Sequence, residues 1–235
     1  MKLLVSVICG KEVIPAVEGG ADIIDIKNPM EGSLGAPYPW VIEEVLNEVG
    51  SERETSCAIG DLPNIPGTAS LAAAGAAKYS PDYIKLGLYG VSDPSGAAGI
   101  IKPAVRAIKY VDPSIGVIAC GYGDWKTIGS ISPLLLPRIA ARSGADGVLI
   151  DTINKDGKSL FDFLSEDQLV KFISEAEDQG IIGALAGSLR EKHAGQLRRC
   201  NPDVVGIRGA ACVGNDRKRG ALSSERVDKF KTALI

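Results

Sequence analysis

Short runs rich in β-branched residues recur along the chain every twenty to thirty-five residues or so, about the length of a βα unit. We expect strands at residues 3–8, 22–26, 54–59, 83–86, 116–120, 147–150, 181–185 and 204–207. Ala-rich amphipathic stretches lie between them, and we expect helices at residues 39–49, 69–78, 97–110, 135–143, 165–179 and 225–234. This alternation predicts an α/β fold with a parallel sheet.

Eight such cycles favour a TIM (β/α)₈ barrel over an open doubly wound sheet. The open Rossmann-like alternative is weakened because no G-x-G-x-x-G sequence follows the first predicted strand. No linker or shift in composition divides the chain, so we expect a single catalytic domain over residues 1–235. Residues 28–39 are rich in Gly and Pro, which suits an active-site loop.

Composition and charge exclude several classes of function. The net charge of -3 gives no basic field for nucleic acid, and no apolar run is long enough for a membrane span. The N-terminus lacks an apolar leader, so we expect a cytoplasmic protein that binds neither nucleic acid nor membrane. The five cysteines are widely spaced and read as reduced thiols.

A single histidine, His193, and scattered cysteines cannot assemble a His-based zinc site. We therefore expect no metal and no organic cofactor. An enzyme built from this chain would rely on Lys, Asp, Arg and backbone N–H groups.

Charged residues gather where predicted strands end. Asp25 and Lys27 close the second strand and share one face, because residues two apart on a strand point the same way. Lys85 lies on the fourth strand, Asp151 ends the sixth, and Lys155 follows four residues later. The carboxyl ends of barrel strands meet at one mouth, so these five side chains are expected to converge there.

This set suits carbanion chemistry through a Schiff base. A lysine between apolar neighbours is costly to bury unless it is paired or neutral, and clustered lysines lower one another's pKa. A neutral amine can attack a carbonyl, and the aspartates can carry protons. Each lysine taken alone is equally consistent with a rim charge or an ion pair, and the residues do not select the nucleophile.

The last two βα turns predict a phosphate site. Gly187 and Ser188 follow the seventh strand, and Arg208 and Gly209 follow the eighth. Small residues let backbone N–H groups approach an anion closely, and an arginine adds a charged guanidinium. TIM barrels commonly bind phosphate at these two turns. We interpret residues 215–220 as a solvated loop, whose positive charges would lie at the edge of the pocket beside a second phosphate.

These segments resemble the (5-formylfuran-3-yl)methyl phosphate synthase family of methanofuran biosynthesis. The resemblance covers essentially the whole chain. It is carried by the residue stretches 25–29, 31–36, 83–90, 151–152, 155–158, 160–163, 185–188 and 205–212.

The resemblance implies a lyase, a class I aldolase-like barrel that condenses two glyceraldehyde 3-phosphate molecules with loss of one phosphate and two waters. It assigns the Schiff base to Lys27 and assisting roles to Asp25, Lys85, Asp151 and Lys155. The expected partner is thus a small triose phosphate. Whether the chain forms a homo-oligomer is left open. Two alternatives also remain: a phosphosugar decarboxylase or epimerase that forms no imine, and a non-catalytic phosphosugar-binding protein.

Overall fold

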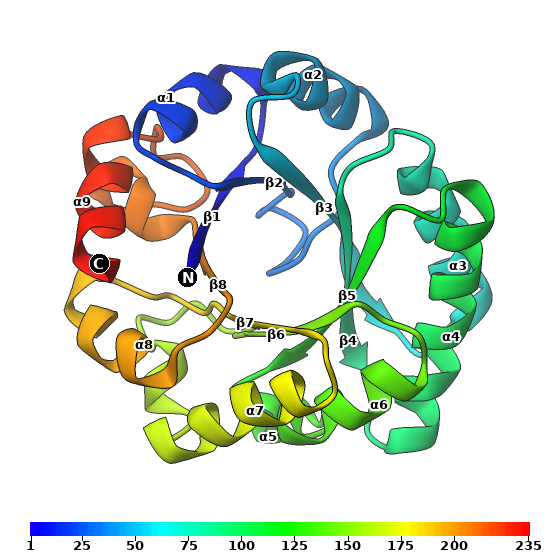
Figure 1. Cartoon of the computed structure of the whole chain (residues 1–235). Coiled ribbons are helices and arrows are strands. Elements are labelled where there is room, and N and C mark those ends of the chain that lie inside the picture. The colour runs from blue at the N-terminus through cyan, green and yellow to red at the C-terminus, as the bar shows by residue number, and fades with distance from the viewer.

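The computed structural model describes all 235 residues, and its eight parallel strands close into a barrel in chain order. Figure 1 shows the helices arranged around these strands, with α9 beside α1 where the ring closes. The strands are β1 (Lys2–Val7), β2 (Ile23–Ile26), β3 (Glu54–Pro63), β4 (Tyr83–Gly90), β5 (Gly116–Tyr122), β6 (Gly147–Asp151), β7 (Ile182–Leu185) and β8 (Val204–Ile207). The predicted TIM barrel is confirmed.

The α-helices lie between successive strands and after the last one. They are α1 (Val13–Glu18), α2 (Pro39–Val49), α3 (Pro66–Ala77), α4 (Pro94–Val111), α5 (Trp125–Ile128), α6 (Leu136–Arg142), α7 (Glu166–Asp178), α8 (Ala194–Cys200) and α9 (Ser224–Leu234). Short 3₁₀ helices are η1 (Gly10–Glu12), η2 (Pro133–Leu135), η3 (Leu160–Asp162), η4 (Glu191–His193), η5 (Gly209–Ala211) and η6 (Val213–Asn215).

Local sequence explains where the longer helices begin. Asp93 caps α4 by accepting a hydrogen bond from the Gly96 N–H, and a proline follows at the first helical position. Ser165 and Gln168 form a capping box at the start of α7. The sequence prediction missed α1, α5 and α8, which have seven residues or fewer and therefore show little periodicity.

Aspartates before every second strand join neighbouring strands at the amino end of the barrel. Asp22 accepts from the Leu3 N–H at 2.6 Å, and Asp82 accepts from the Thr55 N–H at 2.7 Å. Asp146 and Asp203 repeat this contact with the N–H groups of Val117 and Gly183, both at 2.8 Å. Each carboxylate thereby satisfies a backbone donor at the start of the preceding strand.

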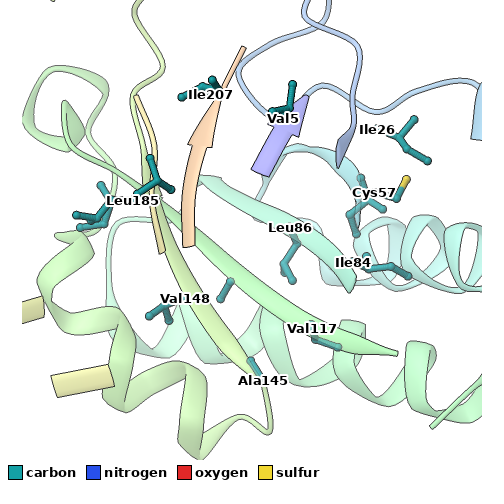
Figure 2. Packing of buried hydrophobic residues seen from close by; sticks show 14 of the residues in the cluster. Val5, Ile26, Cys57, Ile84, Leu86, Val117, Ala145, Val148, Leu185 and Ile207 are labelled. Carbon is teal, nitrogen blue, oxygen red and sulfur yellow. The ribbon is translucent and has the colours of Figure 1, made fainter. Parts of the chain in front are cut away.

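Two apolar clusters hold the layers together. The larger one comprises 55 buried residues between strands and helices, and Figure 2 shows part of it, including Val5, Leu86 and Ile207 from β1, β4 and β8. The smaller one contains Leu4, Ile118 and Tyr122 and fills the barrel interior. Polar residues share that interior, because alternate strand residues face the axis. None of the helices is long and apolar enough to cross a membrane.

Candidate active site

A pocket of about 150 Å³ opens at the carboxyl end of the barrel. The structure brings all nine residues singled out in the sequence to its walls: Asp25, Lys27, Lys85, Asp151, Lys155, Gly187, Ser188, Arg208 and Gly209. They come from five different strand ends, which meet only because the sheet is closed. Their convergence was predicted, whereas the contacts among them were not.

Asp25 is the most deeply buried charge of the pocket. Its Oδ1 lies 2.6 Å from Nζ of Lys85 and accepts from Ser56 Oγ at 2.7 Å, and its Oδ2 accepts from Ser6 Oγ at 2.8 Å. The two serines lie opposite Asp25 on the neighbouring strands. Burial alone would raise the pKa of Asp25, but the positive charges of Lys85 and Lys27 hold that pKa below its usual value.

Lys85 is correspondingly held in its charged form. Burial works to lower the pKa of Lys85, yet the Asp25 carboxylate in contact with it raises that pKa above the usual value. A charged amine cannot attack a carbonyl. Lys85 in this pairing is therefore suited to donating hydrogen bonds and stabilising negative charge.

Asp151 and Lys155 form a second ion pair at the mouth, with Nζ 2.7 Å from Oδ1. Lys155 also donates to Thr152 Oγ1 at 3.0 Å, and the Thr152 N–H donates to Asp151 Oδ1 at 2.7 Å. Burial would raise the pKa of Asp151, but Lys155 and Lys27 lower it far below its usual value. The loop that carries Lys155 is held by Asp124, which accepts from the N–H groups of Ile153 and Asn154.

Lys27 differs from the other two lysines because it lacks a direct partner. Its side chain is buried, with 8% of the residue exposed, and no carboxylate oxygen lies within 4.0 Å of its Nζ. Burial lowers the pKa of Lys27 to about 8, against the opposing influence of Asp151 and Asp25 and with the help of Lys85 and Arg217. Lys27, unlike Lys85, thus has a substantial neutral fraction near physiological pH.

The loop after β2 folds down into the mouth and is fixed by Asp61. This carboxylate accepts from the N–H groups of Ser33 at 2.7 Å and Leu34 at 3.1 Å, and from the Tyr122 hydroxyl at 2.6 Å. Leu34 is buried and lines the pocket as a result. Gly32 has a φ of +155°, and a Cβ there would lie 2.0 Å from the Asp61 carboxylate, so the close approach requires glycine.

The turns after β7 and β8 present unpaired backbone donors. The N–H groups of Gly187, Ser188, Gly209 and Ala210 have no acceptor within the protein. Gly187 and Ser188 both have positive φ, at +106° and +51°, and all four residues line the pocket. Such N–H groups favour an anion, as the sequence analysis anticipated.

Arg208 lines the pocket, yet most of its guanidinium is engaged inside the protein. It forms a buried ion pair with Glu12, with its two terminal nitrogens 2.5 and 3.1 Å from the carboxylate oxygens. It also donates to the carbonyls of Ser6 and Arg217. Four of its five N–H groups are thus committed, which leaves one for a ligand, and its predicted phosphate contact stays a prediction.

Other residues depart from the sequence interpretation. His193 is buried, and its Nδ1 accepts from the Arg190 N–H in the turn before α8. Arg217, expected in a solvated loop, is half-buried and lines the pocket. Ser6 was missed, although a small polar residue two positions after Leu4 on an apolar strand is a signal of an inward polar site.

The buried cysteines Cys57 and Cys120 lie outside the pocket lining. Burial raises the pKa of Cys57 to about 12, and it also raises the pKa of Cys120. Both thiols therefore stay protonated and act as small apolar groups of the barrel wall.

Comparison with solved structures agrees with the closed barrel fold. 3-Hexulose-6-phosphate synthase superposes with a TM-score of 0.64 at 19% identity, and the match covers 100% of both chains. Phosphoribosyl anthranilate isomerase from Thermus thermophilus gives a TM-score of 0.64 at 14% identity, covering 100% of this chain and 98% of that one. At these identities the likeness shows the fold alone.

Comparison of sequences is more specific. The chain is 48% identical over 234 residues to (5-formylfuran-3-yl)methyl phosphate synthase of Methanothermobacter thermautotrophicus, covering 100% of this chain and 99% of the relative. It is 50% identical over 230 residues to the protein of that name from Methanosarcina acetivorans, covering 98% and 97%. The family model described as 4-HFC-P synthase matches residues 3–231. The chain therefore belongs to the 4-HFC-P synthase family.

Proposed function

We propose that this protein condenses two molecules of glyceraldehyde 3-phosphate to (5-formylfuran-3-yl)methyl phosphate, as a carbon–oxygen lyase acting on phosphates. The two trioses together contain one phosphoric acid and two waters more than this product, so the reaction needs no oxidant or reductant. Full-length similarity to relatives with that name supports the proposal. The product would enter methanofuran biosynthesis.

The observation that carries the mechanism is the buried, unpaired amine of Lys27. We assign it the attack on a triose carbonyl, which gives an iminium and water. The iminium draws electrons from the adjacent carbon, so a proton leaves there and an enamine forms. The enamine carbon then bonds to the aldehyde carbon of the second triose. Loss of phosphate, ring closure and dehydration complete the furan.

The two ion pairs suit the charge changes and proton transfers of these reaction steps. Lys85 and Lys155 are charged donors that stabilise developing alkoxides. Asp25 and Asp151 hold those lysines in place, and their lowered pKa values suit this orienting role better than the uptake of protons. The unpaired N–H groups of the turns after β7 and β8 bind one substrate phosphate and orient the carbonyl over Lys27.

The direct test is to incubate the purified protein with glyceraldehyde 3-phosphate and take a mass spectrum of the products. The proposal expects the furan aldehyde phosphate together with one equivalent of inorganic phosphate. Lys27→Arg keeps the charge but removes the nucleophile, and should abolish the product, whereas Lys78→Arg, an exposed lysine remote from the pocket, should not. Unchanged substrate with the active, folded protein would refute the proposal.

A further inference from the structure

Two phosphorylated trioses in one pocket need two places for a phosphate, and this inference rests on the proposed function to that extent. The N–H groups of Gly187, Ser188, Gly209 and Ala210 form one anion site. A second dianion would lie in the same small pocket and would be repelled by the first unless a separate cation neutralised it.

Most cations of the pocket are already engaged. Lys85, Lys155 and Arg208 are each in an ion pair with a carboxylate. Lys27 is unpaired, but a reacting amine must be neutral. The remaining pocket cations are Arg190, which is exposed at the rim, and Arg217, which is half-buried.

Arg217 is held in place at two points. Its carbonyl accepts from Nε of Arg208 at 3.0 Å, which ties its backbone to the buried Glu12–Arg208 pair. Its Nη2 donates to the Gly32 carbonyl at 2.8 Å, which ties its side chain to the loop after β2. No carboxylate oxygen lies within 4.0 Å of the guanidinium.

The guanidinium is therefore fixed over the pocket with four of its five N–H groups unused. Its charge lies close enough to Lys27 to help lower the pKa of that amine, and close enough to Asp151 and Asp61 to interact with both carboxylates. A planar fork with free donors and a half-buried position suits a phosphate group.

We propose that Arg217 binds the phosphate of the second triose, opposite the backbone site formed by the turns after β7 and β8. Arg208 is then a positioning residue, because it holds the Arg217 backbone while most of its own donors are engaged. The contact with Gly32 joins the loop after β2 to the same anion site, so phosphate binding also holds that loop over the pocket.

The test uses inorganic phosphate as the probe, because its binding requires no turnover. Calorimetric titration of the wild-type chain should show two phosphates per chain. Arg217→Met should retain one site with unchanged Kd and weaken the other by about ten- to a hundredfold, the loss expected for a charge-assisted contact. Arg217→Lys should weaken it less. Arg219→Met removes the same charge from an exposed position of the same loop and should leave both sites intact.

The outcomes distinguish this proposal from a purely structural role of Arg217 and from the proposed function. Two phosphates bound with unchanged affinity by Arg217→Met would overturn the assignment, even if the protein makes the furan. Unchanged phosphate binding together with faster hydrogen exchange in residues 28–35 would show that Arg217 only fastens the loop. If two phosphates bind and Arg217→Met loses one, Arg217 is an anion site even where no furan forms, and the proposed function alone fails.

Discussion

Lys85 and Asp25 form an ion pair inside the barrel, with Nζ 2.6 Å from Oδ1 and no more than 3% of either side chain exposed. Lys27 lies two residues after the same aspartate but makes no such contact. One carboxylate therefore keeps one lysine charged while the other stays partly neutral. This division of roles between two neighbouring lysines is the basis of the predictions below.

The pH dependence of imine formation should report Lys27. Only the neutral amine attacks a carbonyl, and burial lowers the pKa of Lys27 to about 8. The rate of reductive trapping with triose phosphate should therefore rise as the pH increases through about 8 and level off above it. Arg217→Met removes a nearby positive charge and should move this inflection to higher pH. An inflection near the ordinary lysine pKa of about 10.4 would contradict the account.

Removing the negative charge from the buried pair should destabilise the fold. Asp25→Asn leaves Lys85 without a counter-charge, and breaking a buried pair this way costs about 3–5 kcal/mol. Urea unfolding is the measurement. Ser56→Ala is the matched control because it removes one hydrogen bond to the same carboxylate, worth about 1 kcal/mol. Similar, small losses in both variants would show that the pair contributes little.

The Glu12–Arg208 pair should behave as a coupled unit. Arg208→Met and Glu12→Gln each leave a buried partner group unsatisfied, so each should lower the free energy of unfolding by about 3–5 kcal/mol. The double variant should lose clearly less than the sum of the two. Additive losses in this double-mutant cycle would show that the two side chains act independently.

Arg208→Met should also weaken triose phosphate binding, by about ten- to a hundredfold, because it releases the Arg217 backbone and a donor beside the phosphate turn. Saturating substrate should still give an imine on Lys27. Titration of the trapping yield against substrate concentration measures both quantities. A folded variant that gives no label at saturation would place Arg208 in the chemistry itself.

The proposed phosphate site at the turn after β7 can be tested by substituting Gly187. Gly187 has a φ of +106°, and an added Cβ would lie 3.0 Å from Cγ2 of Thr152. Gly187→Ala should therefore displace the N–H groups of the turn and raise KM at least tenfold. Gly180→Ala imposes similar backbone strain, with φ of +69°, at an open position remote from the pocket, and should leave KM unchanged. Equal KM values for the two variants would argue against a phosphate site here.

Much of the fold was predictable because strands and helices differ in periodicity. The eight predicted strands all form. β3 and β4 begin at the predicted residues but extend beyond the predicted ends, to Pro63 and Gly90. The pairing continues there across an irregular register that a period-two pattern does not reveal. The aspartates before alternate strands were visible in the sequence, whereas their contacts with the preceding strand depend on tertiary structure.

The sequence predicted which residues line the pocket better than it predicted the contacts among them. Strand-end position identified Asp25, Lys27 and Asp151, since a closed barrel brings all such ends together. Sequence cannot say which lysine is paired, because that depends on side-chain reach across strands. Arg217 was read as a loop residue for the same reason, since its side chain is held by the carbonyl of Gly32, which lies 185 positions earlier in the chain.

The central claim is that Lys27 is the covalent site, and borohydride trapping with glyceraldehyde 3-phosphate followed by peptide mass mapping tests it most directly. The account predicts a reduced adduct on the peptide that contains Lys27. The adduct should persist in Lys85→Arg and Lys155→Arg at reduced yield and disappear in Lys27→Arg. An adduct found only on Lys85 or Lys155, or furan formation by folded Lys27→Arg, would contradict it.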